Sequence, residues 1–225
     1  MLVKNWMSKP AIIVKADAML ADAVHLLQKH EIHTLPVMKG ARLAGIVTDR
    51  DLKNASVPDA WLATSPHGAD RLLQKEISEI MTINPVTVCD NQTIEDTAEL
   101  FLVHNISGLP VTNQARQVVG VITKNDLFRF ILTTIGMGKD GIQFAFEMVD
   151  RPGCVQAVSD IIRDYGGRIG TIFSTRERAQ RGYRQAYIRI YDLDRPGLAR
   201  LKEVLGEKVK MLYIINQREK MSKIF

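Results

Sequence analysis

The chain has 225 residues, of which 46% are hydrophobic and 24% charged, as in an ordinary globular protein with one large or two small domains. It has no apolar run near the roughly 20 residues that span a bilayer, no signal-peptide layout, and only two cysteines, which suggest neither a disulfide framework nor a thiolate metal site. We therefore expect a cytoplasmic protein. The net charge of +5 is uneven, because residues 1–140 hold 14 Lys and Arg against 15 Asp and Glu, whereas residues 141–225 hold 16 against 10.

The first 135 residues repeat one pattern at an offset of 74 to 75 residues. The matched segments are Met7-Ser8 with Met81-Thr82, His30-Glu31-Ile32 with His104-Asn105-Ile106, Leu35-Pro36-Val37 with Leu109-Pro110-Val111, and Gly45 with Gly120. Each copy predicts strand, helix, strand, strand and helix, with strands near 12–14, 34–38 and 43–48, then 86–89, 108–112 and 117–123. Such sustained self-similarity indicates a duplicated unit, at residues 1–56 and 77–135.

Each copy ends in a strand-to-helix corner with the pattern Thr-x-x-Asp. The first corner carries Thr48 and Asp51, and the second carries Thr123 and Asp126. Free N–H groups at a helix start attract phosphate, and a nearby carboxylate can accept hydrogen bonds from a ribose diol. The pattern therefore favours two nucleotide-binding corners. The alternative is a capping box, which only starts a helix and prefers Glu or Gln over Asp at its fourth position.

Residues 57–76 separate the copies as an insert that contains Trp61. Connections of this length are often functional or mobile. Trp61 is expected to pack against the repeats rather than to stack on a ligand base.

The pattern Met…Leu-Pro-Val…Gly-x-x-Thr-x-x-Asp, present twice, resembles a tandem pair of CBS (cystathionine-β-synthase-type) domains, a Bateman module. The resemblance implies that AMP, ADP, ATP or an adenosyl compound binds as a regulatory ligand in the cleft between the repeats. It assigns ribose and phosphate contacts to Thr48, Asp51, Thr123 and Asp126.

The middle of each corner, Arg50 and Asn125, is also placed to meet phosphate. Arg50 suits phosphate better, so the clefts should differ. In the similar regulatory subunit of AMP-activated protein kinase, a His just before the Leu of this strand faces phosphates. His33 matches that position, and Ser107 takes it in the second repeat. We expect no metal site, since His30, His33 and His104 lack partners in sequence.

A Gly-rich linker is expected at residues 136–141, followed by a second domain at 142–217 and a C-terminal tail at 218–225. A strand from Ile142 is followed by a helix that ends at Gly166-Gly167. Next come a hairpin with strands at 168–174 and 183–191, a helix through Leu205 and a last strand at 208–215. The order β-α-β-β-α-β is that of a ferredoxin-like fold, so the whole chain is α+β.

The tetrapeptide Asp150-Arg151-Pro152-Gly153 opens the first helix of this domain and resembles an ACT domain, a regulatory module that often binds amino acids at this loop. The resemblance makes Asp150 and Gly153 a candidate amino-acid site, since Gly permits close approach and the helix start favours a carboxylate. The alternative is that Asp150 only caps the helix, because the same tetrapeptide recurs at residue 194.

The order of two CBS repeats and an ACT domain resembles the AcuB family of acetoin-utilisation proteins. We expect a non-catalytic sensor that modulates an unidentified metabolic protein and forms a homodimer or higher oligomer. The sequence shows no nucleophile with a recurring base partner, no phosphate-binding loop and no metal-ligand cluster, so nothing in it indicates an enzyme. The alternative is a nucleic-acid-associated regulator that uses the basic C-terminal half, with the hairpin tip at 176–184 binding the polyanion and Tyr183 stacking on a base. We favour a solvated tip, or one that meets an acidic protein partner, over this nucleic-acid interpretation.

Overall fold

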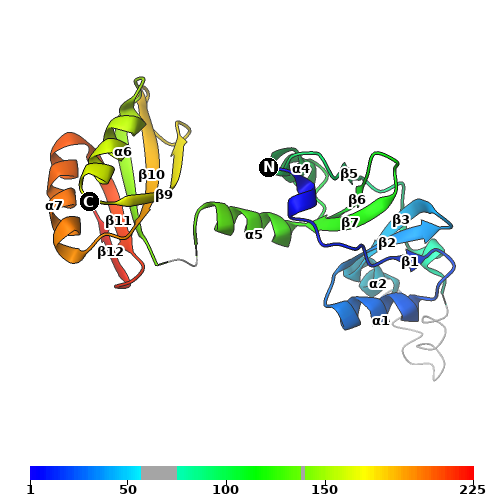
Figure 1. Cartoon of the computed structure of the whole chain (residues 1–225). Coiled ribbons are helices and arrows are strands. Elements are labelled where there is room, and N and C mark those ends of the chain that lie inside the picture. Colours follow the sequence, from blue (N-terminus) through cyan, green and yellow to red (C-terminus); the bar gives the residue numbers. More distant parts are fainter. Residues whose placement is uncertain (57–74, 138–139) are drawn as a thin grey trace. The chain divides into compact units, whose positions relative to one another are not determined.

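The computed structural model describes residues 1–56, 75–137 and 140–225, which divide into two compact units, Met1–Phe128 and Arg129–Phe225 (Figure 1). Trp61 and most of the predicted insert lie outside the described residues. No helix formed by the described residues has the length and apolar character needed to cross a membrane.

Both copies of the duplication form the predicted strand–helix–strand–strand–helix unit. The first consists of β1 (Val14–Lys15), α1 (Leu20–His30), β2 (Thr34–Lys39), β3 (Arg42–Thr48) and α2 (Asp49–Ser56). The second consists of β5 (Val88–Cys89), α4 (Ile94–Val103), β6 (Gly108–Thr112), β7 (Val118–Thr123) and α5 (Lys124–Thr134). In each, the first strand pairs in parallel with the second, which pairs antiparallel with the third. The match extends to a register irregularity directly after the equivalent residues Val37 and Val111.

The two repeats complete one another's sheets. The short strand β4 (Thr82–Ile83) opens the second repeat and pairs with β3 of the first. Reciprocally, Ser8 near the start of the first repeat forms an antiparallel bridge with Val121 of β7. The exchange joins both repeats into the single compact unit Met1–Phe128.

Glycine is required where the exchanged segments cross. A Cβ atom on Gly45 would lie 2.6 Å from Met81 Sδ and 2.8 Å from Thr82 O. A Cβ atom on Gly120 would lie 2.7 Å from both Met7 Sδ and Ser8 O. Real Cβ contacts are not this short, so only Gly lets the backbones approach. The paired Met and Gly residues of the sequence repeat are therefore packing partners across the exchange.

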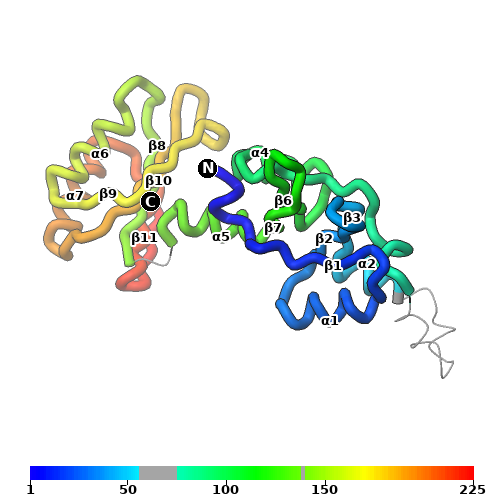
Figure 2. Tube along the Cα trace, turned by 45° about the vertical axis from the view of Figure 1, so that its right-hand side comes forward, coloured from blue at the N-terminus to red at the C-terminus, as the bar shows by residue number. Residues whose placement is uncertain are grey.

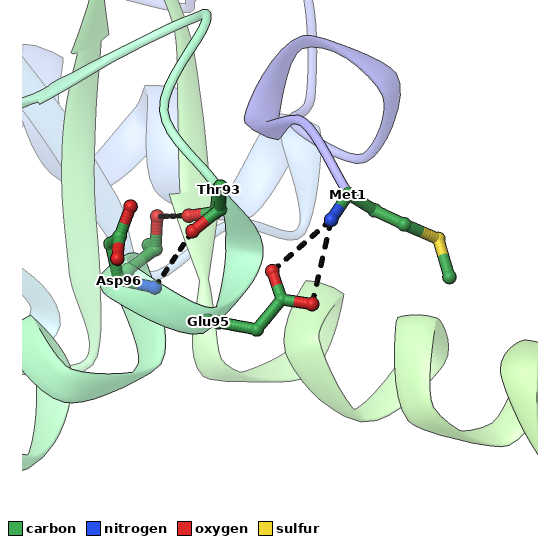
Figure 3. A network of polar contacts seen from close by, with 5 residues as sticks. Met1, Thr93, Glu95 and Asp96 are labelled. Carbon is green, nitrogen blue, oxygen red and sulfur yellow. Dashed lines mark hydrogen bonds and ion pairs between the residues drawn. The ribbon is translucent and has the colours of Figure 1, made fainter.

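The chain start packs against the second repeat through the 3-10 turn η1 (Val3–Asn5), whose equivalent is η2 (Ile77–Glu79). The amino group of Met1 lies 3.1 Å from the Glu95 carboxylate, and Thr93 caps α4 by accepting a hydrogen bond from the Asp96 N–H at 3.1 Å (Figure 3). The bridge between Leu2 and Thr93 has its counterpart in a bridge between Glu76 and Met19.

The second unit is built on an antiparallel sheet with the order β12-β11-β8-β10-β9. Its elements are β8 (Ile142–Val149), α6 (Cys154–Asp164), β9 (Arg168–Thr175), β10 (Tyr183–Tyr191), α7 (Arg195–Lys208), β11 (Lys210–Asn216) and β12 (Met221–Ile224). The expected order β-α-β-β-α-β is present over 142–216 (Figure 2). Apolar side chains of both helices and of the inner strands form one core, which includes Phe144, Phe146, Ile162, Ile188 and Leu201.

Two segments predicted as a tail and a linker are held by hydrogen bonds in this unit. In the predicted C-terminal tail, β12 extends the sheet by pairing with β11. The described positions of the Gly-rich segment 136–141 also have hydrogen-bond partners. Tyr191 donates a hydrogen bond from its hydroxyl to Gly136 O at 3.3 Å, and Gln217 N–H donates to Gly141 O at 3.1 Å.

We predict that Gly120→Ala lowers the stability of the first unit by about 1–3 kcal/mol, because Met7 and Ser8 must move away from the new methyl group. Both tryptophans, Trp6 and Trp61, precede residue 128, and all five tyrosines follow it, so tryptophan fluorescence in a urea titration reports on the first unit.

Gly206→Ala in α7 is the control, because a Cβ atom there meets nothing within 4 Å. This change should leave the tryptophan transition unmoved and should not destabilise its own helix. An unchanged tryptophan midpoint for Gly120→Ala would show that the crossing has room for a side chain.

Candidate functional site

The two Thr-x-x-Asp corners have almost identical geometry. Thr48 Oγ1 donates to Asp51 Oδ2 at 2.7 Å, the Thr48 N–H donates to the same oxygen at 2.8 Å, and the Asp51 N–H donates to Thr48 Oγ1 at 3.3 Å. The corresponding distances for Thr123 and Asp126 are 2.7, 2.8 and 3.4 Å. The capping-box alternative is therefore correct as local structure.

Capping leaves part of the first carboxylate available. All hydrogen bonds that Asp51 accepts from described residues end on Oδ2, so Oδ1 is not used in capping. A carboxylate has about four acceptor positions, and capping fixes its orientation without exhausting them. The two corners differ in exposure, because Asp126 is only 3% exposed whereas Asp51 is half-buried.

The corners lie on either side of a contact between the repeats. Thr34 pairs with Thr48 across β2 and β3, and Gly108 pairs with Thr123 across β6 and β7. Thr34 and Gly108 are equivalent positions, and a Cβ atom on Gly108 would lie 2.8 Å from Thr34 Oγ1. Equivalent residues that touch mark the local twofold axis. The axis therefore runs close to both corners.

The residues beside each corner carry their charges at different positions. The middle residues, Arg50 in the first repeat and Asn125 in the second, are both exposed. The preceding position, which the sequence interpretation missed, is Asp49 in one and Lys124 in the other. Lys124 forms no ion pair within the described ranges, so the second corner also carries a cation beside its Thr-x-x-Asp pattern. A residue-by-residue comparison of the two corners in the sequence could have revealed this cation, because Lys124 stands where the first repeat has Asp49.

His33 and Ser107 lie at the strand ends next to the corners, since the Asp49 N–H donates to His33 O and the Lys124 N–H donates to Ser107 O. The His33 side chain is 73% exposed, and its Nδ1 lies 3.5 Å from Asp49 Oδ2. It lines a pocket of about 600 Å³ between α1 and α2 that does not include Thr48, Arg50 or Asp51. The structure thus brings His33 to Asp49 rather than into one pocket with the ribose-binding candidates.

The two Asp-Arg-Pro-Gly copies have different roles. Asp194 caps α7, because its carboxylate accepts a hydrogen bond from the Gly197 N–H at 2.8 Å. Asp150 does not cap α6, which begins at Cys154 with Gly153 as its left-handed N-cap at φ 79°. The alternative that Asp150 only caps a helix is therefore wrong.

Instead, the Asp150 carboxylate pairs with two arginines of the hairpin. Arg176 donates a hydrogen bond to it, and Arg184 Nε lies 2.8 Å from Oδ1. The pKa of Asp150 is held below its usual value, chiefly by the hydrogen bond from Arg176. These groups line a pocket of about 450 Å³ that also contains Gly153, Cys154 and Gln156.

The sequence interpretation missed Arg176 and Arg184 as parts of this site and placed them at a nucleic-acid-binding tip. Antiparallel pairing sets Tyr183 opposite Val149, so the start of β10 necessarily lies beside the end of β8. That topological argument was available from the predicted order of elements. Two of the tip's arginines therefore share one carboxylate, Asp150, which offsets one of their two positive charges, and Tyr183 is 40% exposed. Within the described ranges, no three His, Cys, Asp or Glu side chains are grouped as metal ligands.

A family model described as the CBS domain matches the chain at residues 3–58 and 77–133. A CBS domain-containing protein of Dictyostelium discoideum is 33% identical over 60% of this chain and 93% of its own length. The solved CBS domain pair of protein MJ0100, in complex with 5′-methylthioadenosine and S-adenosyl-L-methionine, is 33% identical over 58% of this chain and 95% of that chain, with a TM-score of 0.49. A protein from Vibrio cholerae assigned to acetoin utilization (AcuB) is 23% identical over 59% of this chain and 91% of that chain, with a TM-score of 0.49.

The family model and the Dictyostelium relative agree with the duplication seen in the fold. The family matches end at residue 133 and so do not extend over the C-terminal antiparallel, β-rich domain. The chain belongs to the CBS domain proteins and carries a tandem pair of these domains at residues 3–58 and 77–133.

Proposed function

We propose that the protein is a non-catalytic sensor that binds an adenine nucleotide or adenosyl compound between its CBS repeats and thereby modulates a protein partner. The observation that carries the proposal is the pair of equivalent corners beside the local axis, each with a carboxylate oriented by its own Thr. Ribose hydroxyls would donate to the carboxylates, and helix N–H groups with Arg50 or Lys124 would meet phosphate. Regulation would require the ligand to favour one conformation over another.

The first test is calorimetry of the full chain with AMP, ADP, ATP, S-adenosyl-L-methionine and 5′-methylthioadenosine. We expect at least one of them to bind with a dissociation constant of micromolar order, about −8 kcal/mol. Asp51→Ala and Asp126→Ala should each weaken one site by about tenfold or more, because each removes a charged acceptor.

Thr93→Ala is the matched control, since it removes a helix cap of the same module away from the corners and costs about 1 kcal/mol of stability. Binding should survive this change. The double variant Asp51→Ala, Asp126→Ala decides between the two roles. If it binds adenine ligands with the same affinity as the wild type, the corners are helix caps and do not bind the ligand.

For the C-terminal domain we propose a ferredoxin-like ACT domain that binds an amino acid in the Asp150 pocket, in an AcuB-like chain. An amino acid is a zwitterion, and the pocket has a partner for each of its charges. Its ammonium group would pair with Asp150, and its carboxylate would pair with Arg176 and Arg184. The Gly153 N-cap has no side chain and leaves the start of α6 open to the ligand.

A thermal-shift screen of the twenty amino acids tests this pocket, because a ligand that binds only the folded state raises the melting temperature. Asp150→Asn should abolish the shift of any amino acid that binds. Asp194→Asn changes the same residue of the second tetrapeptide, where Asn still caps α7, and should keep the shift. A shift lost in both variants, or in neither, would contradict an amino-acid site at Asp150.

We also propose a homodimer or higher oligomer. In the first unit, Leu102, Val103 and Phe128 are 80%, 69% and 61% exposed, so a contact that covered them would bury apolar surface. Light scattering should report a mass well above the 25.3 kDa of one chain at tens of micromolar.

Leu102→Glu should dissociate the oligomer if this apolar surface forms the contact. Ile224→Glu, at the outer strand β12 of the C-terminal sheet, changes an equally exposed apolar residue and should leave the mass unchanged. A single-chain mass for the wild type would disprove the oligomer, and dissociation by the second change alone would move the contact to the C-terminal domain.

A further inference from the structure

Arg189 is a buried cation on the sheet face opposite the helices of the C-terminal domain. Its neighbours in β10, Ile188 and Ile190, belong to the apolar core, so alternation directs Arg189 to the other face. There it lies between Gln143 of β8 and Thr171 of β9. Only 3% of the residue is exposed.

Among the residues that the structure describes, the guanidinium has neutral partners only. Nη1 donates to Gln217 Oε1 at 2.7 Å, and Nη2 donates to Gln143 Oε1 at 2.6 Å and lies 3.5 Å from Met137 Sδ. No described Asp or Glu pairs with Arg189, and its buried Nε has no hydrogen-bond partner. By contrast, the other buried charge of this sheet, Glu147, has Lys210 Nζ at 2.7 Å.

An unpaired buried charge is costly, and buried cations are normally matched by an anion. Arg189 lines a pocket of about 180 Å³ on this face, together with Ile135, Gln143, Thr171, Phe173 and Tyr187. One side of the pocket thus offers a guanidinium, an amide and a hydroxyl, and the other offers two aromatic rings and an aliphatic chain.

The chain after α5 forms one wall of the pocket. Thr171 Oγ1 donates to Ile135 O at 3.4 Å, and the next residue, Gly136, accepts from the Tyr191 hydroxyl. Gly136 adopts φ 72°, and a Cβ atom on it would lie 2.7 Å from the Tyr191 hydroxyl oxygen. Ile135 is therefore fixed over the sheet as one wall of the pocket.

We propose that this pocket binds a small organic monocarboxylate, whose carboxylate pairs with Arg189 and whose short apolar body lies against Phe173, Tyr187 and Ile135. The site is separate from the Thr-x-x-Asp corners and from the Asp150 pocket, with which it shares no lining residue. The pocket volume and the aromatic walls favour a compact branched or aromatic acid over a bare inorganic anion.

The test is calorimetry of the full chain with isobutyrate and benzoate, each against its neutral amide and against chloride at equal ionic strength. At least one carboxylate should bind saturably and about tenfold or more tightly than its amide and than chloride. The NMR signals of the Tyr187 and Phe173 rings should shift with the same dissociation constant. Failure of both carboxylates to bind the wild type would overturn the proposal.

Arg189→Met keeps the length and removes the charge, and it should abolish carboxylate binding. Because it also removes an unpaired buried charge, the variant should be at least as stable as the wild type. Arg200→Met, an exposed residue of α7, is the matched control and should bind as the wild type does. If Arg189→Met does not fold, Phe173→Trp is the second variant. It narrows the pocket while leaving Arg189 in place, and it should weaken the affinity for isobutyrate about tenfold.

Two further results, both from the variants, would contradict the proposal. Equal affinity for carboxylate in the wild type and in Arg189→Met would make Arg189 a purely structural link between Gln143 and Gln217. Loss of binding in Arg176→Gln but not in Arg189→Met would place the carboxylate in the Asp150 pocket.

Discussion

The close backbone crossings at Gly45 and Gly120 are the constraint on which the first unit depends. Each crossing lets the opening segment of one repeat complete the sheet of the other, so neither repeat has a complete sheet alone. The same crossings fix the local axis near Thr34 and Gly108 and hence bring the two corners close to it. The candidate ligand site is thus a property of the pair.

Short motifs in this chain do not have one meaning each. The Asp-Arg-Pro-Gly segment at 194 is a helix cap, whereas its copy at 150 supplies a carboxylate to two arginines in a pocket. The difference follows from the β9–β10 hairpin, because it brings Arg176 and Arg184 to Asp150 of the first copy. In Thr-x-x-Asp, capping and ligand binding are compatible, since capping of Asp51 uses only Oδ2. Motifs of this length therefore restrict a role without deciding it.

The elements of the repeats were predictable because Gly, Pro and apolar periodicity mark their boundaries, as at Leu35–Val37 and Gly45. The exchange of β4 and Ser8 was not, because a two-residue strand and a single bridge leave no periodic pattern. The burial of Arg189 was not predictable either, because a charged residue in an alternating strand normally indicates a solvent-exposed face. In the structure, the chain around Gly136 packs on this face, and Arg189 is buried.

Helix α5 belongs to both compact units, since the division falls between Phe128 and Arg129. Its first turn supplies Asp126 to the second corner, and the residues that follow its last turn form a wall of the Arg189 pocket. A ligand that orders the first turn and a ligand that orders the last residues therefore act on one hydrogen-bonded element, whose formation is cooperative along its length. If both ligands stabilise the same state of this helix, each must raise the affinity for the other by the same factor, because coupling free energies are reciprocal. The shared helix would thus be the element through which the two proposed ligand sites influence one another.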